Sequence, residues 1–156
     1  MPESVTDQIK RQLERVYSPI KKDIEDLQER LIRDVCPDDP VIRVPFEHLD
    51  ATRGKLIRPA ILFLAARAVG EITEHHRIAA HCVELVHVAS LIHDDVVDHS
   101  SLRRGRASLN ERFGDEKALL VGDYLFARAL SLLAPLDSVD AYQCVSRSIV
   151  SASQGE

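Results

Sequence analysis

The stretch AAHCVELVHVASLIHDD, residues 79–95, is apolar on nearly every side of the helix that its spacing favours. A helix without a polar face is typical of an element enclosed by other helices, whereas a surface helix keeps a charged side. The helical pattern extends from about residue 74 to residue 98. We therefore expect a long central helix over 74–98, with the rest of the domain packed around it.

The segments on either side of this stretch also show helical spacing. Apolar residues three and four positions apart predict a helix over 4–34, which Pro19 should kink or split. Further helical patterns cover 58–68, 116–133 and 139–153, and no alternating strand pattern of useful length occurs. The expected fold is all-α, a single helical domain over 1–156, in which 36–49 is a Pro-containing connector without a helical period.

The composition is that of an ordinary globular protein, with 45% apolar and 29% charged residues among 156. The formal net charge of −5 argues against a nucleic-acid-binding protein, because such proteins usually carry excess positive charge. The N-terminus lacks the apolar region of a secretory signal, and apolar runs such as 59–66 and 85–92 fall short of the ~20 residues of a membrane helix. Three widely spaced cysteines suggest free thiols in a reducing compartment. We expect a soluble, cytoplasmic protein with no transmembrane segment.

Three aspartates stand at the end of the central helix, in the sequence DDVVD. At the helical rotation of about 100° per residue, His87, Asp94 and Asp98 fall on one narrow stripe, and Asp95 lies beside it. Hard divalent cations such as Mg²⁺ take oxygen ligands and are usually held by one or two carboxylates plus substrate phosphates. Because three carboxylates near a helix C-terminus also oppose the helix dipole, we expect a cation there.

Two groups of cations accompany the aspartates. Arg103 and Arg104 follow in a loop that can fold back onto the helix end, and arginine makes planar, bidentate contacts with phosphate oxygens. Upstream, Lys55 and Arg58 of RGKLIRP stand at the expected start of a helix, where backbone N–H groups also bind anions. Together the acidic cluster and the two cationic groups indicate two phosphate-bearing ligands, one bridged by metal and one held by cations alone.

These motifs resemble those of the trans-isoprenyl diphosphate synthase (polyprenyl synthase) family. DDVVD is similar to the family's first aspartate-rich motif, RRG follows shortly after it, and RGKLIRP is similar to the family's GGKRLRP, all in the family's order and spacing. ELVHVASLIHDD and LVGDYLFARAL add to the resemblance, which covers the chain from about residue 50 onward. It implies antiparallel helices bundled around a deep central cavity, usually in a homodimer.

The resemblance also implies roles for single residues. Asp94 and Asp98, with Asp95 beside them, would hold Mg²⁺ on the diphosphate of an allylic substrate, which Arg103 would contact as well, so these four residues are expected to be catalytic. Isopentenyl diphosphate would be held by a second set: Lys55, Arg58, His87 and Arg104. The implied reaction is a head-to-tail (1′-4) condensation that makes an all-trans polyprenyl diphosphate.

The resemblance bears on product length too. In the family, the fourth and fifth positions before the first aspartate-rich motif act as a floor, and here Ser90 and Ala89 occupy them. Both residues are small, and DDVVD carries no insertion, which resembles medium- and long-chain enzymes. We expect a product longer than farnesyl diphosphate, such as octaprenyl diphosphate.

Two departures from the family pattern stand out. Arg53 and Leu56 replace the first glycine and the first arginine of GGKRLRP, while Lys55 and Arg58 remain. Family members are also longer, with a second aspartate-rich motif that this sequence lacks. Three explanations stay open: the N-terminal half of a full synthase, a half-site subunit completed by a partner, or a non-catalytic relative. We favour the first, and expect the chain alone to be inactive and to associate with a second copy or a different subunit.

Two other functions compete with prenyl transfer. His93 and Asp94 form an HD pair, as in HD-type metal phosphohydrolases, but that function gives the two cationic groups no role. A helical scaffold, in which the charges form a salt-bridge network at an interface, is the alternative from outside the enzymes.

Overall fold

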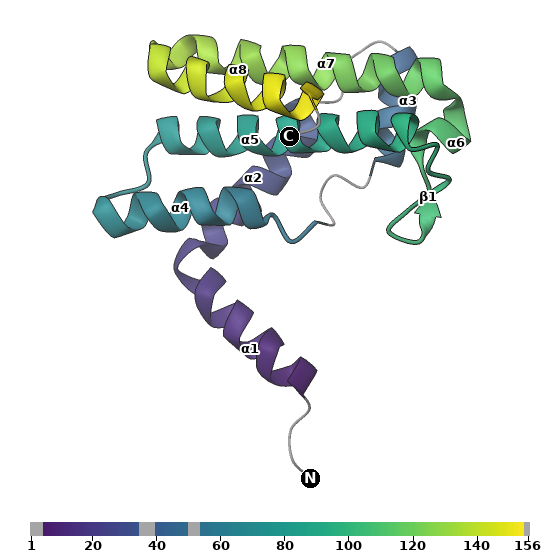
Figure 1. The fold of residues 1–156 in the computed structure, drawn as a ribbon. Helices are drawn as coiled ribbons and strands as arrows, with labels where there is room; N and C mark the ends of the chain where they lie inside the picture. Colours follow the sequence, from purple (N-terminus) through teal and green to yellow (C-terminus); the bar gives the residue numbers. More distant parts are fainter. Residues whose placement is uncertain (1–4, 35–39, 50–53, 155–156) are drawn as a thin grey trace.

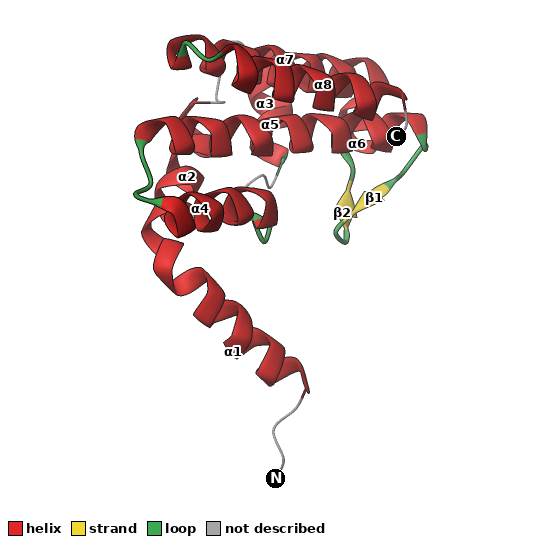
Figure 2. Cartoon of the chain, turned by 60° about the vertical axis from the view of Figure 1, so that its left-hand side comes forward, coloured by secondary structure: helices red, strands yellow, loops and turns green. Residues whose placement is uncertain are grey.

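A computed structural model describes residues 5–34, 40–49 and 54–154, and it is a helical bundle (Figures 1 and 2). The all-α prediction is confirmed, since the only strands in these ranges are two residues long each. The elements follow in the order α1 (Val5–Tyr17), η1 (Ser18–Ile20), α2 (Lys21–Asp34), α3 (Pro40–His48), α4 (Ile57–Val69), α5 (Glu74–Val97), β1 (Leu102–Arg103), β2 (Arg106–Ala107), α6 (Leu109–Phe113), α7 (Asp115–Leu133), η2 (Ala134–Leu136) and α8 (Val139–Gln154).

The central helix is α5, as its apolar sequence predicts. It packs most extensively against α7 and also against α4, α8 and α2. Its start is fixed by Thr73, whose backbone N–H donates to Nδ1 of His76 at 3.0 Å. Two ion pairs join α5 to α2, Arg30 with Glu74 and Arg77 with Asp23. The helix whose middle is apolar on nearly every side is therefore the one with helices on several sides (Figure 1).

The close packing of α5 against α7 depends on a glycine. A Cβ atom placed on Gly122 of α7 would lie 2.4 Å from Nε2 of His93 on α5. The buried face of α7 carries Val121, Leu125 and Ala129, all 0% exposed. By length and composition alone, Asp115–Leu136 could also cross a membrane. This test does not tell a membrane span from a core helix, and here part of the helix faces α5.

The N-terminal segment breaks at Pro19, as expected. Pro19 lies in the short 3-10 helix η1, which separates α1 from α2. Ile20, Leu27 and Leu31 are buried, whereas α1 extends away from the body of the bundle (Figures 1 and 2). Of the described apolar residues of this stripe, Leu13 and Val16 are exposed, and burial begins at Ile20.

The prediction of a connector over 36–49 is wrong for Pro40–His48, which form helix α3. Pro40 takes the first helical position, where its missing N–H costs nothing, and Pro45 lies inside the helix. Pro45 and Phe46 are buried, and α3 packs against α7 and α6. Burial of this apolar surface offsets the hydrogen bond that Pro45 cannot donate. Residues 36–39 lie outside the described ranges.

The predicted loop that carries Arg103 and Arg104 contains an antiparallel hairpin. Leu102 pairs with Ala107 and Arg103 with Arg106. The two residues of the turn, Arg104 and Gly105, have φ angles of 51° and 78°, the positive values that tight hairpin turns require. Helix α6 follows at once and was not predicted, because five residues are too few to show a helical period.

Candidate active site

A cavity of about 340 Å³ lies along one side of α5, between that helix, the end of α3 and the β1–β2 hairpin. The residues that α5 contributes to this cavity are spaced three or four positions apart, as expected for one face of a helix. The residues that line it are His48, Leu49, Glu84, His87, Val88, Leu91, Ile92, Asp95, Arg103, Arg104, Arg106, Ala107, Ser108 and Leu109. The cavity therefore combines an apolar stretch of α5 with a cluster of arginines. The deep central cavity of the resemblance stays a prediction.

Asp94 and Asp98 stand one turn apart at the C-terminal end of α5, and both are exposed. Within 5–34, 40–49 and 54–154, no hydrogen bond or ion pair joins either carboxylate to another side chain. No cluster of three or more potential metal ligands occurs in these ranges either. Two exposed, unpaired carboxylates fit a hard cation such as Mg²⁺ that takes its remaining ligands from substrate phosphates and water. By themselves, the two carboxylates do not complete the coordination of a metal ion.

Asp95 has a different role from its two neighbours, because it is buried and paired with Arg103. The arginine donates from Nη2 to Oδ1 at 2.6 Å and from Nε to Oδ1 and Oδ2 at 3.1 and 3.0 Å. These bonds, together with the fields of the nearby aspartates, raise the pKa of Arg103 above its ordinary value. Asn110 donates to the carbonyl oxygen of Asp95 at 3.3 Å. Of the three aspartates of DDVVD, one thus holds the hairpin against the helix.

The two segments that carry the predicted cationic groups lie side by side in the structure. The guanidinium of Arg104 lies beside Gly54: a Cβ atom on that glycine would be 3.3 Å from Nη1 and 3.5 Å from Nη2. Arg104 reaches this position from the turn of the hairpin. A side chain at residue 54 would crowd the guanidinium, so the glycine lets RGKLIRP and RRG pack together. Arg53 lies outside the described residues.

The segment after Gly54 is held in an unusual backbone conformation. Leu56, the residue before α4, has φ of 47° and is buried. A left-handed conformation is costly for a residue other than glycine and persists where the surroundings enforce it. The hydroxyl of Tyr17, at the end of α1, donates to the carbonyl oxygen of Lys55 at 2.5 Å. These contacts place the exposed side chains of Lys55 and Arg58 beside the start of α4.

His87 and Glu84 show how the electrostatics of the cavity act on its titratable groups. Burial, with the positive fields of Arg58, Arg104 and Arg103, lowers the pKa of His87 to about 4. Burial raises the pKa of Glu84, while the fields of Arg58 and Arg104 oppose that rise. Arg58 and Arg104 therefore shift the pKa of both groups. Nothing in the sequence pattern marks Glu84 as a site residue, although it is the only acid within a long apolar run.

His48 is a second cavity residue that sequence reasoning missed, because α3 was not expected. Its Nδ1 lies 3.1 Å from Nη1 of Arg112, and its Nε2 lies 3.0 Å from the carbonyl oxygen of Ala107. Since arginine can only donate, Nδ1 accepts and Nε2 donates, which fixes the neutral tautomer. His48 thereby ties α3 to α6 and to the hairpin.

The predicted floor residues lie on other sides of α5. Ala89 is completely buried, and the half-buried Ser90 donates from its hydroxyl to the carbonyl oxygen of His87 at 2.9 Å. Neither lines the cavity described above. Their role as a floor stays a prediction.

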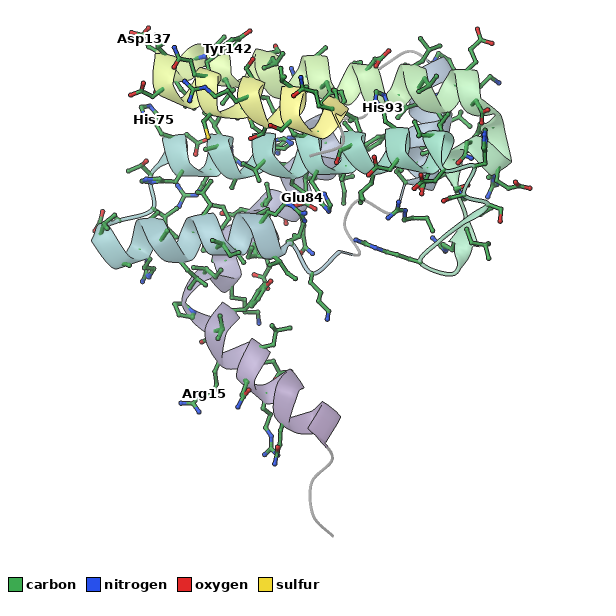
Figure 3. The ribbon with its side chains drawn as sticks, in the orientation of Figure 1. Arg15, His75, Glu84, His93, Asp137 and Tyr142 are labelled. Carbon is green, nitrogen blue, oxygen red and sulfur yellow. The ribbon has the colours of Figure 1, made fainter. Side chains whose placement is uncertain are left out.

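The two residues of the HD pair have different surroundings: Asp94 is exposed, whereas His93 is half-buried. His93 packs edge-on against Phe126 of α7, and its Nε2 is 3.3 Å from Oδ1 of Asp123. Figure 3 shows His93 on the α7 side of α5, whereas Glu84 lies on the side toward α4. His93 thus faces away from the arginines of the cavity, and nothing in this arrangement favours a phosphohydrolase.

Comparison with known proteins agrees with these features. The sequence model of the family "Polyprenyl synthetase" matches residues 39–156. Solanesyl diphosphate synthase 2, chloroplastic, of Arabidopsis thaliana is 36% identical over 150 residues, which are 92% of this chain and 36% of that protein. Heptaprenyl diphosphate synthase component 2 of Geobacillus stearothermophilus is 38% identical over 144 residues, 92% of this chain and 45% of that protein.

A solved structure is similar in fold as well as in sequence. The polyprenyl synthase from Caulobacter crescentus CB15, complexed with calcium and isoprenyl diphosphate, superposes with a TM-score of 0.84 at 37% identity, over 92% of this chain and 44% of that one. The chain spans less than half the length of these relatives. Because the family match covers most of the sequence and includes both cationic groups and DDVVD, the chain belongs to the polyprenyl synthetase family.

Proposed function

We propose that the chain is the N-terminal part of a Mg²⁺-dependent trans-prenyltransferase. The enzyme would condense isopentenyl diphosphate head to tail (1′-4) with an allylic diphosphate. One observation carries the proposal: Arg104, next to the Asp95–Arg103 pair, packs against Gly54, the chain neighbour of Lys55, which supports one anion site shared by cations from two distant motifs. Asp94 and Asp98 lie unpaired at the end of the same helix.

Each group has a distinct task in this reaction. Bound Mg²⁺ would supply positive charge to the leaving diphosphate of the allylic substrate. Asp94 and Asp98 would hold the metal, and Arg103, locked in place by Asp95, adds preorganised positive charge near the leaving group. Lys55, Arg58 and Arg104, with neutral His87 beside them, would hold the isopentenyl diphosphate. The apolar side chains of Val88, Leu91 and Ile92 keep water away from the reacting carbons.

The product is proposed to be an all-trans polyprenyl diphosphate longer than farnesyl diphosphate, such as octaprenyl diphosphate. Small residues at Ala89 and Ser90 support this length, as do the names of the solanesyl and heptaprenyl relatives. Ser90 is the better position to test, because it is half-buried whereas Ala89 is enclosed by the core. Ser90→Phe should shorten the extracted product, and an unchanged product length would remove this residue from the floor.

The protein is further proposed to work as an oligomer, as a homodimer or with a second kind of subunit. The relative from Geobacillus supports the second arrangement, because its name describes one component of a synthase. Size measurement by light scattering on the purified protein distinguishes a monomer, a dimer and a mixed complex. We also propose a cytoplasmic location, consistent with the free thiols of Cys82 and Cys144. Cell fractionation tests it.

The test of function is incorporation of radiolabelled isopentenyl diphosphate into extractable product, with Mg²⁺ and farnesyl or geranylgeranyl diphosphate. We expect the 156-residue chain alone to be inactive and a longer protein with a second aspartate-rich motif to be active. In the active protein, Asp94→Ala should lower kcat/KM by about 100-fold or more, the usual cost of losing one preorganised electrostatic contact. Glu116→Ala, an exposed acid on α7, is the matched control. Equal activity of the two variants would refute the metal assignment.

A second comparison separates the two diphosphate sites. Arg104→Ala should raise the KM for isopentenyl diphosphate more than the KM for the allylic substrate. The reverse pattern would mean that the two sites are interchanged.

A further inference from the structure

Glu84 is a buried acid on the cavity wall that the proposed reaction does not use. Its residue surface is 5% exposed, and it lines the cavity together with His87 and Arg104. Among the residues that the structure describes, none donates a hydrogen bond to its carboxylate or forms an ion pair with it within 4 Å. A buried carboxylate without a direct partner is costly, because it loses its hydration without a full replacement.

The charged and titratable groups around Glu84 on other elements are two arginines and one tyrosine. Arg58 at the start of α4 and Arg104 in the hairpin turn act on it with positive fields, and Tyr17 at the end of α1 is close enough to sense its charge. His87 follows one turn along α5 and senses the same two arginines. Glu84 therefore lies on the side of α5 that faces α4 (Figure 3), within electrostatic range of two of the cations to which the proposed function assigns the isopentenyl diphosphate.

Arg104 lines the cavity, and Arg58 lies near enough to act on Glu84 from outside it, so a diphosphate held by these two arginines and an ionised Glu84 would repel each other. The bound anion adds negative charge and also engages the two arginines that stabilise the carboxylate. A protonated carboxyl removes the repulsion and can donate one hydrogen bond to a phosphate oxygen. Burial, which raises the pKa of Glu84, makes the proton easier to acquire.

We propose that Glu84 is a residue of the diphosphate site that binds its ligand in the protonated form, so that diphosphate binding is coupled to uptake of a proton. The inference rests on the proposed function, because it takes the cations around Glu84 to be an anion site. Diphosphate binding then tightens as the pH falls, independently of the titration of diphosphate itself.

The experiment is calorimetric titration of the protein with inorganic diphosphate. Measuring at one pH in two buffers of different ionisation enthalpy counts the protons taken up on binding. We expect the wild-type protein to take up as much as one proton more than Glu84→Gln, whose side chain stays neutral. Between about pH 5 and pH 8, the ratio of the wild-type Kd to the Glu84→Gln Kd should rise by up to ~10-fold per pH unit. Comparing the two proteins cancels the titration of diphosphate and of His87.

Two controls separate this effect from a change in packing or in net charge. Glu84→Asp keeps a titratable carboxyl and should retain the extra proton uptake, which a merely structural role of Glu84 would not require. Glu116→Gln removes one remote negative charge and should behave like the wild-type protein. Sulfate keeps a constant charge in this pH range and serves as a second probe. Protons taken up when the wild-type protein binds sulfate come from the protein itself, so the test stays valid if Glu84→Gln does not fold.

The outcomes distinguish the inference from the function on which it rests. Equal proton uptake by wild-type protein and Glu84→Gln, with both binding diphosphate, would overturn the role of Glu84 and leave the site intact. Absence of diphosphate and sulfate binding in every folded variant would overturn the anion site itself, and the inference with it.

Discussion

Replacing Asp95 with Asn tests whether this aspartate holds the hairpin rather than a metal. Arg103 donates three hydrogen bonds to its carboxylate, and the side chains of Asp95 and Arg103 are 9% and 39% exposed. Breaking a fully buried pair costs about 3–5 kcal/mol, whereas an exposed pair contributes about 0.2–1 kcal/mol. Because water can reach the guanidinium, and because Asn can still accept one hydrogen bond, we expect a loss of about 2 kcal/mol in the free energy of unfolding.

The assay is urea unfolding followed by circular dichroism, with the midpoint and slope analysed separately. Asp98→Asn is the matched control: it removes the same charge from the same motif, but its side chain is exposed and has no described partner, so the change should stay within about 0.5 kcal/mol. A double-mutant cycle with Arg103→Ala should give a coupling energy near the whole loss. Equal effects of the Asp95 and Asp98 replacements, or a coupling energy near zero, would refute the assignment.

Three further predictions follow from contacts in the same region. Gly122→Ala should destabilise the protein by about 1–2 kcal/mol in thermal unfolding, because the new Cβ overlaps the ring of His93 by more than the helix propensity of alanine offsets. As the pH falls from about 6.5 to about 4, the unfolded chain protonates His87 before the folded protein does, so stability is lost in this range and His87→Gln should lose less of it. Tyr17→Phe removes the hydrogen bond to the Lys55 carbonyl and should cost about 1 kcal/mol in urea unfolding.

Each of these predictions has an internal check. Gly70→Ala meets no atom within 4 Å and should not destabilise the protein as Gly122→Ala does; similar losses would contradict the overlap. An unchanged pH profile in His87→Gln would place the acid-sensitive group elsewhere. Tyr142→Phe alters an exposed tyrosine and should be neutral, so an equal cost at both tyrosines would argue against the Lys55 contact.

The long helices could be predicted because their apolar residues recur with a helical period. This holds for α4, α5, α7 and α8, and for the break at Pro19. Helix α3 was missed because its prolines suggest irregular structure, and only the burial of Pro45 and Phe46 against other helices favours the helix. Tertiary packing of this kind is not visible in a local pattern.

The candidate site was predictable in its members but not in their arrangement. The spacing of DDVVD on a helix predicts two carboxylates one turn apart, and the structure shows them. It does not predict that Asp95 is bound by Arg103, nor that Arg104 lies against Gly54, because both contacts depend on the path of the hairpin. Glu84 was missed for the same reason: its importance comes from arginines on two other elements.

The continuous helix α5 fixes the spacing of the site residues along it. Glu84, His87 and Asp95 reach the cavity from one face, and Asp94 and Asp98 end the same rod, so their separations are fixed by helical rise rather than by loops. Inserting one residue between His87 and Asp94 would turn the acidic end by about 100° relative to the cavity, and would move it ~1.5 Å further along the axis. Point substitutions can therefore change single contacts along this helix, whereas an insertion or deletion would shift all the carboxylates at its end relative to the cations.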